Sequence, residues 1–422
     1  MILMAVAATL SLDQRIDDAA RAVEPKVIEC RRDIHQHPEL GNREFRTSKL
    51  VADKLKQLGI EVRTPIAHTG VIGILRGGKP GRTVALRADM DALPVTEQVD
   101  LPFKSTVRTT YNGQEVGVMH ACGHDAHVAI LLGVAEVLSS IRSELPGTIV
   151  FLFQPAEEGA PQGEEGGAAL MVKEGALDNP KVDAVFGLHV TSRYPVGQIA
   201  YRPGAELAAV DSFRIVVHGK QTHGAYPWLG VDPIVVASQI VLALQMIPSR
   251  QIDVSLAPAV VTVGAIHGGV RNNIIPDDVE MIGTIRSLDE KMRSDIHQRI
   301  KRTAEEIASA AGAKADVKIE TGYPVTYNDP ALTEKIAPTF RKVTSDVIVV
   351  NPTLGAEDFS FYQTKVPGVF FWLGTRPKNQ TAEEAASNHS PLFYVDESGL
   401  GLGIRAMAHV AVDALIIAAP SP

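Results

Sequence analysis

Two short stretches of the chain contain the residue types that bind metal ions. HACGHD, at 120–125, holds a cysteine, two histidines and an aspartate, and thiolate and imidazole groups are preferred ligands of zinc and related ions. Cys122 and His124 can turn toward the same ion because Gly123 between them permits unusual backbone dihedrals. The alternative interpretation is a buried cysteine beside a helix-capping turn, since a free cysteine is usually a small buried hydrophobe.

The second stretch, FQPAEEG at 153–159, places Glu157 and Glu158 directly after an apolar run. Carboxylates in that position are costly unless they are paired or bound to a cation. Adjacent residues of an extended segment point to opposite sides, so one glutamate can ligate a metal while the other exchanges protons with water that the metal activates. A solvated acidic loop is the alternative, and it fits Glu164 and Glu165 better because glycine and glutamine surround them.

The elements around these stretches predict how their side chains meet. Strands are expected at 83–89, 148–153 and 182–190, and a helix at 125–141. This alternation indicates an α/β sheet, in which ligand sites lie at the carboxyl ends of the strands. Asp89 and Asp91 follow the first strand, the paired glutamates follow the second, and His189 closes the third. We therefore expect these polar groups to converge on one edge of the sheet.

The pattern changes in the second half of the chain. Strands are expected there at 213–219, 260–266 and 279–287, with helices at 231–247 and 289–311. This order predicts an inserted α+β domain at 204–316 with a four-stranded antiparallel sheet. We expect residues 13–203 and 317–418 to form a discontinuous catalytic domain with a mixed, mostly parallel sheet flanked by helices.

Composition narrows the class of protein. The 422 residues are 45% hydrophobic and 21% charged with a formal net charge of −8, which predicts a soluble two-domain protein without a nucleic-acid partner. Only Cys30 and Cys122 occur, so a reduced thiol at Cys122 is expected rather than a disulfide framework.

The apolar start MILMAVAATL is too short to cross a membrane, and we expect no membrane partner. The default compartment is the cytoplasm, with a periplasmic or secreted protein as the alternative if this start is a signal-peptide remnant.

Eight motifs occur in order along nearly the whole chain. They are RADMDALP (87–94), MHACGHDAH (119–127), FQPAEEG (153–159), GLHV (187–190), HGKQTHGAYP (218–227), RNNIIPD (271–277), GAEDFS (355–360) and SNHSPLF (387–393). Together they resemble the motif series of the M20 metallopeptidases. The resemblance is closest to the amidohydrolase branch, which includes N-acyl-amino-acid amidohydrolases, hippurate hydrolases and auxin-conjugate hydrolases.

The resemblance implies two divalent transition-metal ions per chain, whether Zn, Mn, Co or Ni. The implied ligands are Cys122, His124, Glu158, His189 and His389, with Cys122 as a bridging thiolate. Glu157 is implied as the general base and acid, and Asp91 as a residue that orients the site. Asp89 stands where many relatives have a metal-binding histidine, so the resemblance gives it no role. We assign no chemistry to His35 and His37, and expect His120 and His127 to pack beside the metal ligands or support them.

The inserted domain resembles the family's lid and dimerisation domain. By this resemblance His223 reaches the scissile carbonyl oxygen, often from the partner subunit, as an oxyanion-hole donor. Asn273 and Arg286 would hold the substrate carboxylate, and the protein would be a homo-oligomer, dimer or tetramer, assembled through the lid domain.

The implied reaction is hydrolysis of the amide of an N-acyl L-amino acid, a small-molecule substrate, to a carboxylic acid and a free amino acid. The alternative within enzymes is a dipeptidase or carboxypeptidase that acts on short peptides through the same site. Two rivals belong to other classes: a hydrolase with Cys122 as nucleophile, and a non-catalytic, dimeric metal-binding protein. Sensitivity to chelation separates the first rival from the metal enzyme, and the intact Glu157 disfavours the second.

Overall fold

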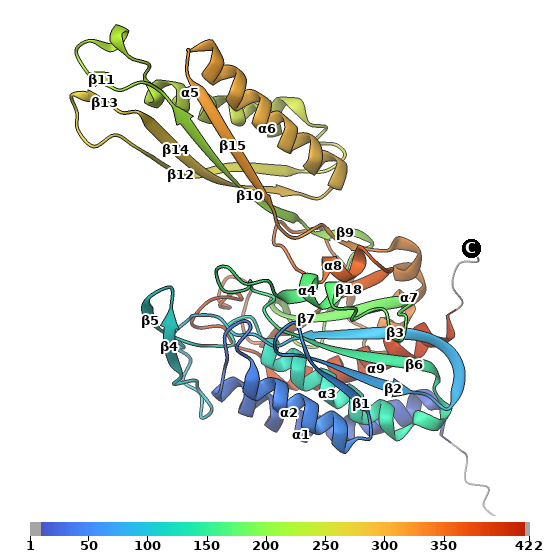
Figure 1. Ribbon diagram of the computed structural model, residues 1–422. Coiled ribbons are helices and arrows are strands. Elements are labelled where there is room, and N and C mark those ends of the chain that lie inside the picture. The colour runs from blue at the N-terminus through green and yellow to red at the C-terminus, as the bar shows by residue number, and fades with distance from the viewer. Residues whose placement is uncertain (1–9, 418–422) are drawn as a thin grey trace, which may run out of the picture. The chain divides into compact units, whose positions relative to one another are not determined.

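An eight-stranded mixed sheet forms the centre of the larger of two units into which the chain divides in the computed structural model (Figure 1). The structure describes residues 10–417. The larger unit comprises the described residues up to Gly204, Asn328–Val350 and those from Phe361 onward, and the smaller unit comprises Ala205–Tyr327 and Asn351–Ser360. The smaller unit therefore extends past the expected boundary at 316 and includes a second segment.

The strand order in the large sheet is β1-β2-β6-β3-β7-β18-β8-β17. These strands are β1 (Glu61–Ile66), β2 (Gly70–Arg76), β3 (Lys79–Asp89), β6 (Pro146–Gln154), β7 (Ala184–Pro195), β8 (Ile199–Tyr201), β17 (Val347–Val349) and β18 (Gly368–Arg376). The central strands β6, β3, β7 and β18 run parallel, whereas β1 and β2 add an antiparallel edge. The predicted mixed, mostly parallel sheet is confirmed.

Helices cover this sheet, and most of them lie on one face. They are α1 (Leu12–Gln36), α2 (Phe45–Gln57), α3 (His124–Ser140), α4 (Gly167–Lys173), α7 (Pro330–Val343) and α9 (Leu400–Ile416). Figure 1 shows α1, α2, α3 and α9 together on one side and α4 on the other. A hairpin of β4 (Arg108–Tyr111) and β5 (Gln114–Gly117) separates β3 from α3 in the chain.

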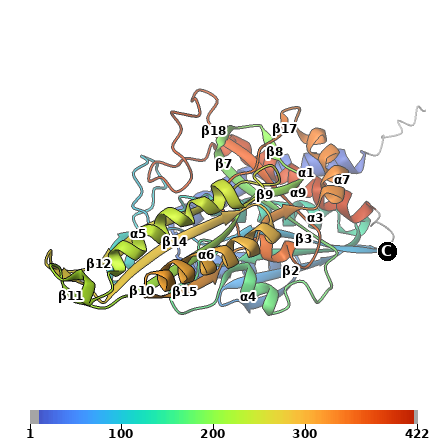
Figure 2. The same cartoon turned by 90° about the horizontal axis from the view of Figure 1, so that it is seen from above.

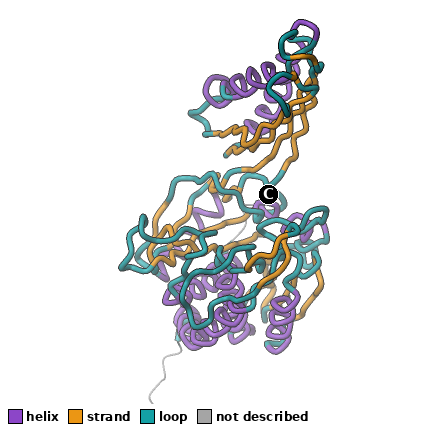
Figure 3. The backbone as a smooth tube through the Cα atoms, turned by 90° about the vertical axis from the view of Figure 1, so that its left-hand side faces the viewer, coloured by secondary structure: helices purple, strands orange, loops and turns teal. Residues whose placement is uncertain are grey.

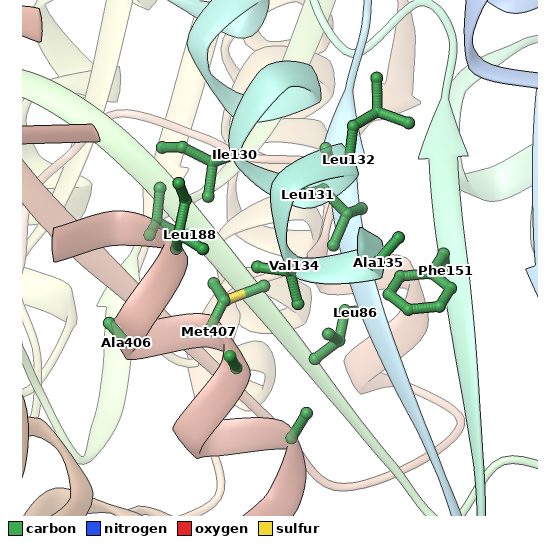
Figure 4. Close-up of a cluster of buried hydrophobic side chains, with 14 of the residues drawn as sticks. Leu86, Ile130, Leu131, Leu132, Val134, Ala135, Phe151, Leu188, Ala406 and Met407 are labelled. Atoms are coloured by element: carbon green, nitrogen blue, oxygen red, sulfur yellow. The ribbon is translucent and has the colours of Figure 1, made fainter. Parts of the chain in front are cut away.

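Helix α3 is deeply enclosed in the large unit. Nearly all its residues are buried, because it packs against α1 and α9 as well as the sheet, and a helix that is apolar all round requires such surroundings. Figure 4 shows Ile130 and Val134 of α3 meeting Leu86 of β3, Leu188 of β7 and Met407 of α9. This packing fixes the first turn of α3 against the ends of β3 and β7.

The smaller unit contains the predicted four-stranded antiparallel sheet, in the order β12-β14-β10-β15. Its elements are β10 (Ala209–His218), β11 (Thr222–His223), α5 (Pro233–Leu244), β12 (Ala259–Gly268), β13 (Ile274–Ile275), β14 (Asp278–Ser287), α6 (Glu290–Ala310) and β15 (Lys314–Thr321). Burial alternates along β10, as expected for a sheet with one covered face. Figure 2 shows α5 and α6 lying alongside each other, and in Figure 3 helices of the smaller unit lie beside its strands.

Two helical stretches of the described residues are long and apolar enough to cross a membrane, Pro233–Gln251 and Glu397–Ile416. The second is 72% buried because it packs in the core of the large unit. A core helix can be as long and as apolar as a membrane-spanning helix. The first is only 33% buried, so it presents a large apolar surface outside the core of the smaller unit.

Candidate metal centre

The candidate centre lies where β3, β6 and β7 bring their polar residues together. Strand β3 pairs in parallel with both β6 and β7, and Asp89 at its end lies opposite Gln154 at the end of β6. The loop after β6 therefore carries Glu157 and Glu158 to the same edge of the sheet where Asp89 ends its strand. The predicted convergence on one sheet edge is found in the structure.

Gly123 joins the two candidate ligands of HACGHD at the start of α3. Its φ is +93°, and a Cβ atom there would lie 2.4 Å from Cγ2 of Val190. Any side chain at this position would therefore collide with β7, in addition to the strain of a left-handed backbone. This turn places Cys122 just before the helix and His124 in its first turn.

Five groups of side chains in the described residues have ligand atoms within 4.8 Å of one another. Cys122 belongs to two of them, once with His124 and His189 and once with Glu158 and His389. All five residues expected as ligands are therefore gathered in the large unit, and the thiol lies between two sets of donors.

Hydrogen bonds orient the imidazoles of this cluster. Nδ1 of His124 is 2.9 Å from the carbonyl oxygen of Asp91, and Nδ1 of His189 is 2.7 Å from the carbonyl oxygen of Val190. In each case Nδ1–H donates to the carbonyl oxygen, so Nε2 is unprotonated and its lone pair can bind a metal. Metal-binding histidines are commonly oriented in this way. Nε2 of His124 is buried without a hydrogen-bond partner in the described chain, and Nε2 of His189 lies 3.4 Å from Sγ of Cys122.

Asp91 holds the two glutamates in place. Its Oδ1 accepts a hydrogen bond of 3.0 Å from the backbone N–H of Glu157, and its Oδ2 accepts one of 3.0 Å from that of Glu158. Oδ1 also lies 3.3 Å from Nδ1 of His124. One buried carboxylate thus connects three residues of the cluster.

The electrostatics of the cluster favour a cation. Burial would lower the pKa of His124, but Asp89 and Asp91 outweigh it and raise the pKa to about 10. Burial together with Glu158 and Glu157 raises the pKa of the Cys122 thiol well above its usual value. Carboxylates are therefore in excess, and the donor set of thiol, imidazole and carboxylate suits a transition-metal ion. The residues present fit such an ion.

His127 and Asp89 support the cluster. Asp89 hydrogen-bonds Nδ1 of His127 and pairs with the Arg87 guanidinium; burial would raise its pKa, but Arg87 and the neighbouring histidines hold that pKa well below its usual value. Nε2 of His127 accepts a hydrogen bond of 2.8 Å from the N–H of Val190. Both ring nitrogens are thus engaged, which agrees with the supporting role expected for His127.

His389 reaches the cluster from a long loop between β18 and α9. Its φ is +71°, its N–H donates to the carbonyl oxygen of Ala121 at 2.8 Å, and its Nε2 lies 3.0 Å from Oε1 of Glu158. The amide of Asn388 donates to the carbonyl oxygens of Cys122 and Val190, at 3.1 Å each. These bonds fix the loop to the turn before α3.

Of the other histidines near the cluster, His35 has both ring nitrogens engaged, whereas neither ring nitrogen of His120 has a hydrogen-bond partner in the described chain. His35 of α1 is buried, with Nδ1 2.8 Å from Oδ2 of Asp125 and Nε2 3.1 Å from Oε1 of Glu97; burial would lower its pKa, but these carboxylates raise it. It therefore connects α1 to the first turn of α3. His120 is buried and burial lowers its pKa to about 3, so it packs as a neutral ring, whereas His37 is exposed.

Glu44 is a residue that the sequence did not reveal. It is fully buried, and its Oε1 accepts a hydrogen bond of 2.9 Å from the N–H of Ala156. Ala156 has a φ of +49° and directly precedes Glu157. Glu44 lies in the polar stretch GNREF before an amphipathic helix, where a glutamate is normally exposed, so the local sequence carries no signal of this contact.

The three candidate residues of the smaller unit do not lie together. His223 on β11 pairs with Ile274 of β13, and the N–H of Gly224 donates to the carbonyl oxygen of Asn273, so His223 and Asn273 are neighbours. Arg286 lies at the other end of β14, eight residues after Asp278. At about 3.4 Å per residue, roughly 27 Å of strand separates that end from the β13 end.

Comparisons with known proteins find similar sequences and structures over nearly the whole chain. A model of "Peptidase family M20/M25/M40" matches residues 85–413. The chain is 46% identical over 405 residues to thermostable carboxypeptidase 1 of Saccharolobus solfataricus, covering 96% of this chain and 99% of that protein. It is 39% identical over 378 residues to N-acetyl-L-cysteine deacetylase of Bacillus subtilis, covering 90% and 85%. The crystal structure of the Bacillus subtilis YXEP protein, described as a dinuclear metal binding peptidase from the M20 family, matches with a TM-score of 0.80, 36% identity and coverage of 94% and 99%.

Proposed function

The chain belongs to peptidase family M20/M25/M40 and is a metal-dependent hydrolase of amide or peptide bonds, and from this premise we propose that it is a dinuclear amidohydrolase of N-acyl L-amino acids. The observation that carries the proposal is the double membership of Cys122, which shares one ligand group with His124 and His189 and another with Glu158 and His389. A thiolate between two donor sets can bridge two ions. The name of the deacetylase relative supports an acylated amino acid as substrate.

These residues would hold two transition-metal ions, which when bound supply Lewis acidity that activates water and polarises the scissile carbonyl. Glu157 takes the proton from the attacking water and passes it to the leaving amine. Its position suits this role, since its backbone N–H is fixed by Asp91 and its Oε2 lies 3.9 Å from Nε2 of His124. Zn, Mn, Co and Ni all suit the donor set.

His223, Asn273 and Arg286 would act on the substrate from two different subunits. His223 and Asn273 lie at one end of the small sheet and Arg286 at the other. His223 and Arg286 of a single copy are therefore too far apart to contact the same small molecule. We propose that His223 donates to the carbonyl oxygen from the partner subunit, with Asn273 beside it, and that Arg286 holds the carboxylate as a charged donor. The protein would then be a homo-oligomer that needs at least two copies per site.

The cysteine-nucleophile alternative is disfavoured by the charge states around Cys122. Its nearest imidazole is His189, and burial together with His127 lowers the pKa of His189 well below its usual value, while that of the thiol is raised. Both shifts oppose a thiolate–imidazolium pair. A carboxypeptidase acting on short peptides uses the same metal residues and differs only in the group on the acyl side.

Metal analysis coupled to an amino-acid release assay tests the proposal. We expect about two transition-metal ions per chain, and release of the amino acid from N-acetyl and N-benzoyl substrates that is lost after chelation and restored by added metal. Turnover that persists in the chelated protein would overturn the dinuclear assignment and favour Cys122 as nucleophile. Release from peptides alone would favour the carboxypeptidase.

A further inference from the structure

The loop that carries Glu157 and Glu158 is attached to the large unit at two places. Near its start, Asp91 accepts hydrogen bonds from the N–H groups of Glu157 and Glu158. Its far end, at Glu164 and Glu165, contacts the segment just before α2. The sequence favoured a solvated acidic loop for this second pair of acids, whereas the structure gives both of them partners in a distant segment.

Asn42 is the buried partner of the far end of the loop. It is 1% exposed and has a φ of +59°, a backbone conformation that asparagine tolerates better than most residues. Its Nδ2 donates hydrogen bonds of 3.0 Å to Oε2 of Glu164 and to the carbonyl oxygen of Glu165. Gly166 packs closely on the same amide, since a Cβ atom there would lie 2.8 Å from Oδ1 of Asn42. Asn42 thus supports three consecutive residues of the loop.

Arg43 adds a two-point ion pair to the same carboxylate. Its Nη1 donates to Oε2 of Glu164 at 3.1 Å, and its Nη2 donates to Oε1. Nη1 also donates to the carbonyl oxygen of Asn42 at 2.9 Å. The hydrogen bonds from Arg43 and Asn42 lower the pKa of Glu164 from 4.5 to about 2, so this carboxylate is ionised at neutral pH. Bidentate pairs of this kind fix geometry as well as adding energy.

The span between the two attachments begins and ends with glycine. Gly159 and Gly163 have φ values of +108° and +84°, and a Cβ atom at either position would meet no atom beyond its chain neighbours within 4 Å. Glycine has more backbone freedom to lose on ordering than any other residue. Because Glu158 directly precedes this span, the attachment at Glu164 restricts the positions that Glu158 can adopt.

We propose that Asn42 and Arg43 are positioning residues for the candidate metal centre, and that with Glu164 they form a latch that keeps Glu157 and Glu158 in place. The inference rests on the proposed function, since it takes Glu158 as a metal ligand and Glu157 as the residue that carries the proton. Glu164 is exposed, and ion pairs at a surface add little to stability. We therefore expect the latch to act on the position of the loop and not on the stability of the fold.

The test compares two neighbouring acids of the loop. Glu164→Ala removes the carboxylate of the latch. Glu165→Ala removes an exposed carboxylate that pairs with Lys173, and it keeps the backbone carbonyl that Asn42 holds. Both variants lose one negative charge in the same loop, so the difference between them reports on the latch.

The first measurement is competition for metal between a chelator and the Co²⁺-loaded protein, and it needs no substrate. We expect Glu164→Ala to bind one of its two ions about tenfold more weakly than wild type, as when support for a metal ligand is lost. Glu165→Ala should bind both ions as wild type does. The Tm of each metal-free variant should stay within about 3 °C of wild type, which separates loss of position from loss of stability.

The second measurement is hydrolysis of an N-acyl amino acid by the fully loaded enzymes. We expect kcat of Glu164→Ala to fall about tenfold while KM stays within about threefold, because the latch acts on Glu157 and not on the bound substrate. Arg43→Ala should weaken metal binding to a similar extent. The double variant Arg43→Ala/Glu164→Ala should bind metal no more weakly than the weaker single variant, since both changes break the same pair.

The outcomes separate the latch from the proposed function. Equal metal affinity and equal kcat in Glu164→Ala and Glu165→Ala would overturn the latch while the amidohydrolase stands. If metal-loaded wild type cleaves no N-acyl amino acid, the proposed function fails, and the metal competition still decides whether the latch supports the metal centre. If Glu164→Ala does not fold, Arg43→Ala breaks the same ion pair from the other side, and unchanged metal binding in that variant would overturn the latch.

Discussion

At the scale of single residues, the cluster buries a thiol, imidazoles and carboxylates close together. Cys122, His124 and the paired glutamates are buried or nearly so, and burial of such groups is unfavourable unless they are compensated. Asp91 compensates part of this cost by accepting both glutamate N–H groups. Because Asp91 holds Glu157 through the backbone N–H, the proposed proton transfer falls to the side chain of Glu157, and this role would distinguish it from a purely structural acid.

Replacing Glu157 by Gln tests that distinction. Gln keeps the size of the side chain but cannot accept a proton, so we expect kcat to fall about 1,000-fold with unchanged metal content and thermal stability. Kinetics on an N-acyl amino acid and metal analysis on the same preparation measure both quantities. Glu165→Gln is the control, since Glu165 is an exposed acid paired with Lys173 and its loss should leave kcat within about twofold. Near-normal turnover in Glu157→Gln would remove this residue from the reaction.

At the scale of elements, the loop after β6 depends on a contact with a distant segment. Ala156 has a positive φ, which costs about 1 kcal/mol in a residue other than glycine. Glu44, just before α2, holds the N–H of Ala156 and also bonds the Thr69 hydroxyl before β2. The loop that carries Glu157 and Glu158 is therefore positioned by the packing of α2 and β2 as well as by its own strand.

Glu44→Gln probes this contact through pH. Burial and the nearby Asp91 raise the pKa of Glu44 from 4.5 to about 8, so the folded protein holds a proton that the unfolded chain releases between these values. The unfolded state binds fewer protons in this range, and stability falls as pH rises from about 4.5 to 8, by up to about 4 kcal/mol. Gln cannot ionise, so the Tm of metal-free Glu44→Gln minus that of metal-free wild type should increase steadily as pH rises through this range.

Glu174→Gln is the matched control for that measurement. Glu174 also accepts the N–H of an alanine with positive φ, Ala67, at 2.7 Å, but it is exposed. Its Tm difference from wild type should stay constant between pH 5 and 8. A constant difference for Glu44→Gln as well would mean that Glu44 is ionised in the folded protein, and the contact would have to be reinterpreted.

The sequence predicted the elements whose signals are local. Helix α3 and strands β3, β6 and β7 have apolar runs that end in polar residues, so both their type and the meeting of their ends could be expected. Strands β1 and β2 were not predicted, and β15 runs to Thr321, past the expected boundary, although its sequence KADVKIET alternates polar and apolar residues as a half-buried strand does. Glu44 and the ion pairs of His35 could not be foreseen, since their partners are distant in sequence and only the folded packing brings them together.

At the scale of the whole molecule, the smaller unit has an apolar surface that its own core does not use. Val235, Leu242 and Met246 along α5 and just after it are 54%, 73% and 51% exposed, and β12 is an edge strand of the sheet. Helix α5 contacts the edge strand β12 as well as β14 and β10, so the exposed helix face and the open edge are adjacent. A two-fold dimer would cover both, because the same surface can pair with itself.

Such a dimer makes a definite prediction about which subunit supplies His223. Glu157→Gln and His223→Ala should each be nearly inactive alone. If His223 acts on the partner's site, mixing the two variants under conditions that exchange subunits should restore about a quarter of wild-type activity, since half of the dimers are then mixed and each has one complete site. Size-exclusion chromatography with light scattering on wild type and Leu242→Glu, with exposed Ile416→Glu of α9 as control, checks that α5 forms the interface. Mixed samples that stay inactive despite demonstrated exchange would place His223 in its own subunit's site, because in that case neither chain of a mixed dimer holds both Glu157 and His223.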